Sequence, residues 1–439
     1  MRDWTRRRLL LTAASATGLA AAGTAPAHGS GHDGLVERLR ALPGLRIVAE
    51  QPAGHPGYRF FVLGLRQPVD HTDPAAGTFE QRLALLHTSA DRPTVVYTGG
   101  YAAGLTPERT EPTELLGGNQ VEVEHRFFGA STPGTPDWRH LTIRQAADDH
   151  HRVIRTLRRL LPGAWISVGG SKGGMASVYH RRFHPHDVDG TVAYSAPNNV
   201  DDQDDSAYHR FLETVGTAAE RDALKAAQRQ CLLRRADMVA RYTAWAASEG
   251  TGFSIIGSAD QAFETAVLRA SFMFWQNSGP AIPGPDATTD ELYTWLWSTA
   301  ALPVYADATV REYVPYFYQL GTQLGYLDVP VAHLADLLRH PDALAPRSFV
   351  PRDIPMRFDP GAMPDIDRWV RRHGHRILFV NGERDPAVAE HFRPGGRDSR
   401  TLWVPGGDHH VAIARLSTAD RAAAVSALAR WTGAPLTPR

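Results

Sequence analysis

Between residues 165 and 173 the chain reads Trp165-Ile166-Ser167-Val168-Gly169-Gly170-Ser171-Lys172-Gly173. Residues 165–168 form a largely apolar, β-branched run that is typical of a buried strand, and residues 173–183 follow a helical pattern. Glycines on both sides of Ser171 allow a tight turn between strand and helix that exposes the serine hydroxyl. Neither of the two glycine-rich motifs that bind phosphate groups, G-x-x-x-x-G-K-[ST] and G-x-G-x-x-G, is present in this segment. The segment therefore predicts a nucleophilic serine at the end of a strand.

A serine hydroxyl becomes a useful nucleophile only when a base takes its proton and a carboxylate orients that base. In enzymes with a serine turn of this kind, the acid and then the histidine follow the serine, each in a loop after a late strand. Here Asn381-Gly382-Glu383-Arg384-Asp385-Pro386 follows the apolar run 376–380, and Pro405-Gly406-Gly407-Asp408-His409-His410 follows the run 401–404. We expect a catalytic triad of Ser171, Asp385 and His409.

Each of the two loops holds a second candidate. Glu383 is an alternative to Asp385, although an aspartate before a proline matches the usual acid loop better. His410 is an alternative to His409, and the Gly-Gly-x-His turn favours His409. The other histidines form no convincing metal site, so we expect neither a metal nor another cofactor.

Strand-like runs alternate with helical patterns along most of the chain. Strands are expected at residues 60–63, 81–87, 94–97, 120–123, 165–168, 191–194, 376–380 and 401–404, and helices at residues 143–161, 173–183 and 418–431. This alternation predicts an α/β protein whose mostly parallel sheet is covered on both faces. Together with the serine turn and the order of its partners, it predicts an α/β-hydrolase fold.

Residues 201–350 have a different character. They combine long helical patterns with clustered aromatic residues and show almost no strand alternation. We expect a helical cap inserted between two parts of the α/β core, residues 28–200 and 351–439. We see no internal repeat.

An acyl-transfer enzyme also needs two backbone N–H groups that stabilise the developing oxyanion. The first is expected at Lys172, directly after the nucleophile. The second is expected in the loop that follows residues 94–97, where Gly99-Gly100-Tyr101 permits close approach and offers Gly100 or Tyr101. The alternative for the glycine pair is a simple tight turn.

The N-terminal 27 residues have the pattern of an export signal. Arg6-Arg7-Arg8 precedes a small-residue apolar run from Leu11 to Ala22, which ends near Ala25-Pro26-Ala27. A charged region, an apolar region and an A-x-A cleavage site define such a signal, and the paired arginines indicate the twin-arginine type. The sequence therefore predicts a secreted, extracellular protein. The apolar run is too short for a spanning helix of about 20 residues, so no stable membrane association is expected.

Composition excludes several other classes. The chain has 47 basic and 47 acidic residues, so no strongly basic face is available for nucleic acid. Its single cysteine, Cys231, allows neither an internal disulfide nor a thiolate metal cluster.

Several longer motifs resemble one family of peptidases along nearly the whole mature chain. They are Gln67-Pro68-Val69-Asp70-His71, Gly77-Thr78-Phe79-Glu80-Gln81-Arg82, Glu124-His125-Arg126-Phe127-Phe128-Gly129-Ala130-Ser131, Leu141-Thr142-Ile143-Arg144-Gln145-Ala146, Gly170-Ser171-Lys172-Gly173-Gly174, Tyr194-Ser195-Ala196-Pro197-Asn198 and Tyr316-Phe317-Tyr318-Gln319 with Leu324-Gly325-Tyr326. The family is that of the secreted tripeptidyl aminopeptidases of actinobacteria, including prolyl tri/tetrapeptidyl aminopeptidases, which are distantly similar to lysosomal prolylcarboxypeptidase and dipeptidyl peptidase II. The resemblance implies peptide substrates and an acyl-enzyme formed on Ser171. It also implies release of tri- or tetrapeptides, often after proline, and a cap that admits only peptide N-termini.

An enzyme of that type must recognise an α-ammonium group, and a partly desolvated carboxylate does so through a charge-assisted hydrogen bond. Glu124 and the run Asp201–Asp205 are the candidates, with Glu124 preferred. The alternative for Glu124 is an ion pair with an arginine. The alternative for the run Asp201–Asp205 is a solvated face or a helix cap. The aromatic residues Trp275, Tyr316 and Tyr318 are expected to line the substrate site.

Two other functions stay open from the residues alone. An exported esterase or lipase would use the same triad and an equally aromatic cap. A non-catalytic binding protein of the same fold is disfavoured because all three triad positions carry competent residues.

Overall fold

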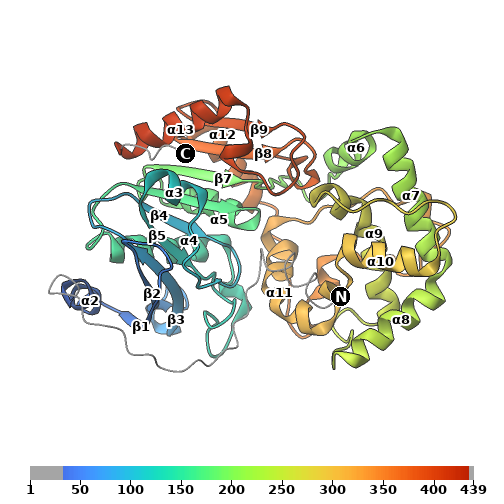
Figure 1. The fold of residues 1–439 in the computed structure, drawn as a ribbon. Helices are drawn as coiled ribbons and strands as arrows, with labels where there is room; N and C mark the ends of the chain where they lie inside the picture. The colour runs from blue at the N-terminus through green and yellow to red at the C-terminus, as the bar shows by residue number, and fades with distance from the viewer. Residues whose placement is uncertain (1–32, 435–439) are drawn as a thin grey trace.

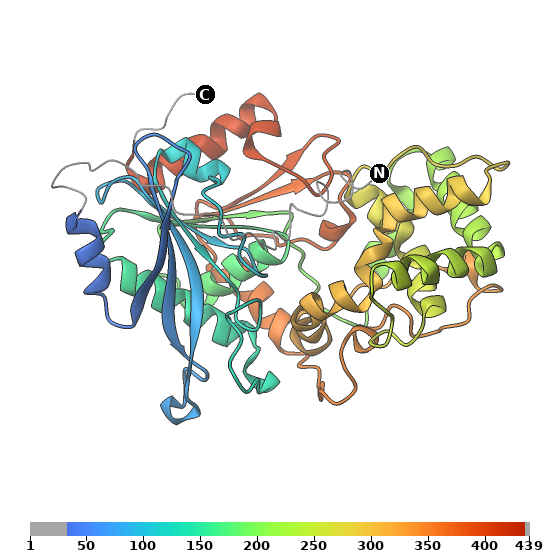
Figure 2. The ribbon, with the colours of Figure 1, turned by 60° about the horizontal axis from the view of Figure 1, so that its bottom comes forward.

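The computed structural model describes residues 33–434, and the expected export signal at residues 1–27 lies outside them. Within the described residues, nine strands form one sheet in the order β1-β2-β3-β5-β4-β6-β7-β8-β9 (Figures 1 and 2). The strands are β1 (Leu45–Gln51), β2 (Arg59–Pro68), β3 (Thr78–His87), β4 (Thr94–Thr98), β5 (Asn119–Val123), β6 (Trp165–Gly170), β7 (Gly190–Tyr194), β8 (Ile377–Gly382) and β9 (Arg400–Val404).

The sheet is antiparallel from β1 to β5 and parallel from β5 to β9. Each parallel strand is reached through a crossover, and most crossovers contain a helix. The helices of this α/β core are α2 (Asp33–Arg40), α3 (Glu111–Leu116), α4 (Ile143–Leu157), α5 (Lys172–Phe183), α12 (Ala362–His373) and α13 (Thr418–Thr432). The α/β-hydrolase fold predicted from the sequence is confirmed.

Both faces of the parallel part are buried, because successive strand residues point to opposite sides of a sheet. Val95 and Val192 pack in one apolar cluster with side chains of α3 and α13. Their neighbours Val96 and Ala193 face the other side, where α4, α5 and α12 cover the sheet. The carboxyl ends of β6, β7, β8 and β9 therefore lie at the edge of a rigid sheet that is covered by helices on both faces.

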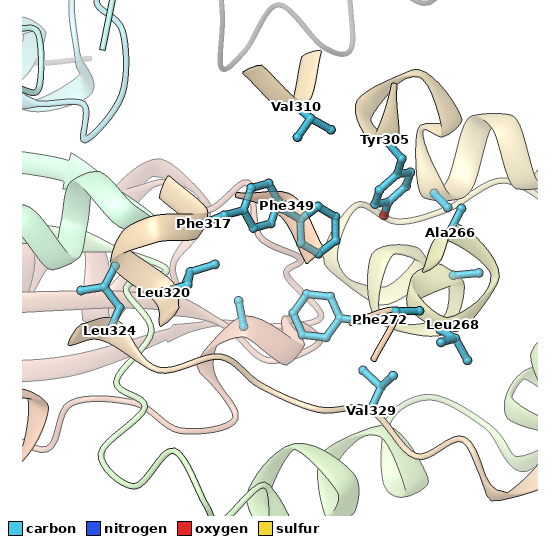
Figure 3. Packing of buried hydrophobic residues seen from close by; sticks show 14 of the residues in the cluster. Ala266, Leu268, Phe272, Tyr305, Val310, Phe317, Leu320, Leu324, Val329 and Phe349 are labelled. Atoms are coloured by element: carbon cyan, nitrogen blue, oxygen red, sulfur yellow. The ribbon is translucent and has the colours of Figure 1, made fainter. Parts of the chain in front are cut away.

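A helical unit lies beside the core between β7 and β8 (Figures 1 and 2). Its helices are α6 (Ser206–Thr214), α7 (Ala218–Leu233), α8 (Arg235–Ser248), α9 (Ala259–Gln276), α10 (Thr289–Ala300) and α11 (Asp307–Gln319). Figure 3 shows part of its apolar interior, where Phe317 and Phe349 stack with ring centroids 4.1 Å apart and Leu320 and Leu324 pack nearby. The domain boundaries expected at residues 201 and 350 stay a prediction.

No helix among residues 33–434 combines the length and apolar character needed to cross a membrane.

Candidate active site

The turn that presents Ser171 is sterically tight. Ser171 has φ 52° and ψ −126°, a left-handed conformation that costs a non-glycine residue about 1–3 kcal/mol. A Cβ on Gly169 would collide with the backbone of Gly173, and one on Gly173 would collide with the carbonyl oxygen of Thr98. Only glycine fits at these two positions, and the serine between them stands at the carboxyl end of β6 and the start of α5.

Asp385 and His409 meet at the same edge of the sheet. Asp385 follows β8, His409 follows β9, and His409 Nδ1 lies 2.7 Å from Asp385 Oδ2. The Asp385 carboxylate is fully buried, and its Oδ1 accepts the N–H of Ala387 at 3.0 Å. This second bond holds the carboxylate in place, and because Nδ1 is bonded to Asp385, Nε2 is the ring nitrogen that can accept a proton.

The alternative residues in the two loops have other partners. Glu383 is exposed and accepts the N–H of Gly406 at 2.9 Å, which ties the Asp385 loop to the His409 loop. His410 is exposed, and its backbone N–H donates to Asp408 Oδ1 at 3.0 Å. The arrangement therefore pairs Asp385 with His409 and leaves Glu383 and His410 on the surface.

Electrostatics separate the two histidines further. Burial alone would lower the pKa of His409, but the charge and hydrogen bond of Asp385 outweigh it, and the pKa is raised above its usual 6.5. Burial lowers the pKa of His410, and the neighbouring His409 lowers it further. His409 is thus the histidine whose protonated form is stabilised, which suits a group that receives a proton during a reaction.

The loop after β4 packs directly on the serine turn. A Cβ on Gly100 would lie 2.9 Å from the nitrogen of Gly173, so glycine is needed for this approach. The side-chain nitrogen of Lys172 donates a hydrogen bond to the carbonyl oxygen of Gly100. That nitrogen also lies 5.2 Å from the ring centre of Tyr101 and 5.0 Å from that of Phe128. The three expected oxyanion residues, Lys172, Gly100 and Tyr101, are therefore adjacent.

Lys172 is unusual in its surroundings. It is 3% exposed, and within residues 33–434 no carboxylate forms an ion pair with it. Burial lowers the pKa of its amine well below the usual value. From the sequence a role was expected only for the backbone N–H of Lys172, although a lysine directly after a nucleophile is a visible signal for the side chain as well.

The expected role of Glu124 does not fit its position. Its carboxylate is 1% exposed and accepts the N–H of Ser131 at 3.0 Å and the hydroxyl of the same residue at 2.7 Å. A third donor is the N–H of Ala103 at 3.3 Å, and Arg82 lies 3.7 Å away. Glu124 closes the loop of residues 125–131 from inside, and its burial separates the carboxylate from an incoming ammonium group.

The three expected aromatic residues have separate locations. Tyr316 is half-buried beside Tyr101, with ring centroids 5.5 Å apart, and so lies next to the serine turn. Tyr318 points elsewhere, because two helical positions differ by about 200°, and it packs against Trp138. Trp275 is 2% exposed and lies under Arg384, whose guanidinium is 4.7 Å from the indole centre. Of the three, Tyr316 contacts a residue beside the serine turn. The substrate-lining roles expected for Tyr316, Tyr318 and Trp275 stay a prediction.

The helical unit is fastened to the loops that carry Asp385 and His409. The N–H of His409 donates to the carbonyl oxygen of Gln276 at the end of α9, at 3.0 Å. Ser278 Oγ donates to Asp408 Oδ2 at 2.7 Å, and Arg384 lies 3.6 Å from Glu220 on α7. A movement of this helical unit would therefore displace both loops.

One histidine-rich cluster lies away from this edge. Among the described residues, His151, His184 and Asp187 bring their ligand atoms within 4.8 Å of one another. His151 is already bonded to Asp187 at 2.7 Å, and His184 to Asp148 at 2.7 Å. His184 follows α5, a helix of 12 residues and about 18 Å that begins after Ser171, so the cluster is remote from the serine.

Comparisons with known proteins identify several relatives of this chain. A family model described as PS-10 peptidase S37 matches residues 32–438. The chain is 46% identical over 429 residues to the prolyl tri/tetrapeptidyl aminopeptidase of Streptomyces mobaraensis, covering 96% of this chain and 88% of that protein. It is 33% identical over 181 residues to the lysosomal Pro-X carboxypeptidase of Homo sapiens, covering 36% of each. A solved structure of proline iminopeptidase from Mycobacterium smegmatis is similar over 84% of this chain and 98% of that one, with a TM-score of 0.40 and 13% identity.

The family model and the aminopeptidase of Streptomyces mobaraensis confirm the resemblance noted in the sequence and favour a peptidase over an esterase or a binding protein. The chain belongs to the PS-10 peptidase S37 family, and it is a serine peptidase that acts on peptides.

Proposed function

We propose that this peptidase releases tri- or tetrapeptides from free peptide N-termini, with a preference for proline before the cleaved bond. The proposal is supported by the 46% identity to a prolyl tri/tetrapeptidyl aminopeptidase over nearly the whole chain. The observation that carries the chemistry is the 2.7 Å bond between His409 and Asp385, at the sheet edge where Ser171 follows β6.

In the proposed mechanism, Ser171 Oγ attacks the carbonyl carbon of the scissile bond while His409 Nε2 takes its proton. Asp385 holds the imidazole and stabilises its charged form. The N–H of Lys172 and a second N–H from Gly100 or Tyr101 stabilise the oxyanion. The tetrahedral intermediate collapses, His409 gives its proton to the leaving amine, and an acyl-enzyme remains. Water, deprotonated by His409, then attacks the ester and releases the peptide from Ser171.

The helices α6–α11 are proposed to act as a cap that restricts access to chain ends. Their ties to the His409 loop, through Gln276 and Ser278, support this role. A cap in this place would block a chain that continues past the N-terminal residues, which is the behaviour expected of an exopeptidase.

Export is also proposed. The arginine-rich start, the apolar run and the Ala25-Pro26-Ala27 site support cleavage after residue 27. Replacing Arg6, Arg7 and Arg8 by lysine keeps the positive charge, so only a pathway that reads arginine should fail. Normal export of the lysine variant would show that the signal is not of the twin-arginine type.

The activity is tested with a panel of di-, tri- and tetrapeptide anilides, with and without proline at the residue before the anilide. Rapid cleavage of tri- or tetrapeptide substrates and slow cleavage of dipeptide ones is the expected pattern. Ser171→Ala should lower the rate on the order of a million-fold while the protein stays folded. Equal cleavage of all lengths, or activity near wild type in the purified Ser171→Ala protein, would contradict the proposal.

A further inference from the structure

A small cavity lies beside the serine turn, between the α/β core and the helical unit. Its volume is about 10 Å³, which is close to the space that a single water molecule needs. None of the residues around it is more than 5% exposed. The polar side chains in its wall include His125, His150 of α4, Lys172 at the start of α5 and Gln319, the last residue of α11.

Two polar atoms of this wall have no hydrogen-bond partner among residues 33–434. They are Nδ1 of His150 and Oε1 of Gln319. Burial lowers the pKa of His150 to about 3, so its ring is neutral and has one nitrogen free to accept a hydrogen bond. Unpaired polar atoms inside a protein are rare, and each calls for an explanation.

The amine of Lys172 has a hydrogen to spare at the same cavity. It donates one hydrogen bond, to the carbonyl oxygen of Gly100. An amine carries two hydrogens when it is neutral and three when it is charged, so at least one remains for another acceptor. The wall therefore combines a donor on Lys172 with acceptors on His150 and Gln319.

His125 connects the cavity to the loop that holds Gly100 and Tyr101. Its backbone N–H donates to the carbonyl oxygen of Tyr101 at 3.0 Å. Its Nδ1 lies 2.9 Å from the carbonyl oxygen of Arg126, and because that oxygen only accepts, Nδ1 carries the hydrogen. The two residues that hold the carbonyl oxygens of Gly100 and Tyr101, Lys172 and His125, thus meet at one cavity.

We propose that the cavity binds one water molecule, which accepts a hydrogen bond from Lys172 Nζ and donates to His150 Nδ1 and Gln319 Oε1. Three partners are typical of a buried water molecule. The water fixes the amine of Lys172, and the amine fixes the Gly100–Tyr101 peptide, which is proposed to supply the second oxyanion N–H.

Gln319 and His150 are therefore positioning residues for the oxyanion donor. Since Gln319 belongs to α11, the geometry of this donor depends on the helical unit as well as on the core. The inference rests on the oxyanion role proposed for the Gly100–Tyr101 peptide and does not depend on the proposed preference for peptide N-termini.

The water itself is tested by a crystal structure of the wild-type protein at a resolution that shows ordered water. One water molecule bonded to Lys172, His150 and Gln319 is the expected result. A direct contact between Lys172 and Gln319, or a cavity without ordered water, would overturn the proposal.

The positioning role is tested with Gln319→Met, which keeps the length of the side chain and removes its oxygen. We expect kcat to fall about 10-fold, the equivalent of one neutral hydrogen bond, with little change in KM. In a Lys172→Met background the same change should have almost no further effect, because the amine through which the water acts is gone.

The matched control is Gln323→Met, in the segment that follows α11. Gln323 Oε1 accepts the N–H of Ile143 at 2.8 Å, so this side chain also joins the helical unit to α4, but it does not line the cavity. The control should keep the kcat of the wild type.

Rates are measured on Ala-Ala-Pro p-nitroanilide and on p-nitrophenyl acetate, per serine labelled to completion by a fluorophosphonate. The ester needs the oxyanion donors but has no peptide N-terminus. If the wild type cleaved only the ester, the aminopeptidase function would be refuted, and the ester rates would still test the water site.

A wild-type kcat in Gln319→Met would overturn the positioning role. A loss of the same size in the Lys172→Met background, or an equal loss in Gln323→Met, would overturn it too, because the change would then act through the packing of the helical unit.

Discussion

Lys172 and Gly100 are joined by a hydrogen bond from a buried amine to a main-chain oxygen. In a trans peptide the C=O and the following N–H point in opposite directions. Holding the oxygen of Gly100 therefore fixes the N–H of Tyr101 toward the other side of the loop. The Tyr101 oxygen is held as well, by the N–H of His125 at 3.0 Å. The Lys172 side chain thus orients the peptide that we expect to supply the second oxyanion donor.

The Lys172→Met variant should lose the bond to Gly100 and leave the Gly100–Tyr101 peptide free to rotate. Loss of one oxyanion donor lowers kcat by about 100- to 1,000-fold, so a fall of that order is expected with little change in KM. The chain has one other lysine, Lys225, which is exposed on α7. Lys225→Met is therefore the matched control and should be unaffected. A change in KM alone for Lys172→Met would contradict the positioning role.

The raised pKa of His409 predicts the acid limb of the pH profile. The neutral imidazole is the form that accepts the serine proton, so kcat/KM should fall as the pH drops through a value above 6.5. In Asp385→Asn the attraction that raises this pKa is gone and burial remains, so the limb should move to lower pH. The same variant should lose about 10⁴-fold in kcat, because the imidazole loses its orienting anion. A limb that does not move would mean that another group controls it.

Replacing the two adjacent histidines should give very different results. His409→Ala should be about as damaging as Ser171→Ala, on the order of a million-fold, because base and nucleophile act as a unit. His410→Ala should be much milder, since the side chain of His410 is exposed and lies outside the bond to Asp385. Initial rates of the two purified variants decide the matter. The reverse ranking would move the base to His410.

Much of the fold could be predicted because buried parallel strands are nearly continuous apolar runs. All eight expected strands overlap observed ones, from β2 to β9. The ninth, β1, was missed. Of its seven residues only Leu45 is buried, and a register irregularity between Ile47 and Ala49 interrupts its pairing with β2. An exposed edge strand of this kind carries little apolar pattern to recognise.

The positions of side chains at the site were harder to predict than the strands. Glu124 was correctly placed at the end of a strand, but the loop beyond it folds back, with φ 68° at Phe127 and φ 50° at Gly129. That reversal brings Ser131 onto the Glu124 carboxylate and buries it. The opposite directions of Tyr316 and Tyr318, by contrast, follow from helical geometry alone.

Arg126, in the motif Glu124–Gly129, forms a buried ion pair with Asp149 that should dominate the stability of this region. Arg126 Nε and Nη2 bind both oxygens of Asp149 at 2.7 and 2.8 Å, and both side chains are almost fully buried. Arg126 also donates to the carbonyl oxygens of Val69 and His140, at 3.0 and 2.8 Å. One guanidinium therefore holds the loop after β2, the loop before α4 and α4 itself.

Arg126→Met should lower the free energy of unfolding by about 3–5 kcal/mol, because it leaves the Asp149 carboxylate buried without its cation. The control is Arg139→Ala, which removes the ion pair between Arg139 and Asp137. The Arg139 side chain is 82% exposed, so this change should lower the free energy of unfolding by less than about 1 kcal/mol. Denaturant midpoints of the two variants give the comparison. Adding Asp149→Asn to Arg126→Met should recover part of the loss, since the unpaired charge disappears. Similar midpoints for the two single variants would mean that the buried pair contributes no more than a surface one.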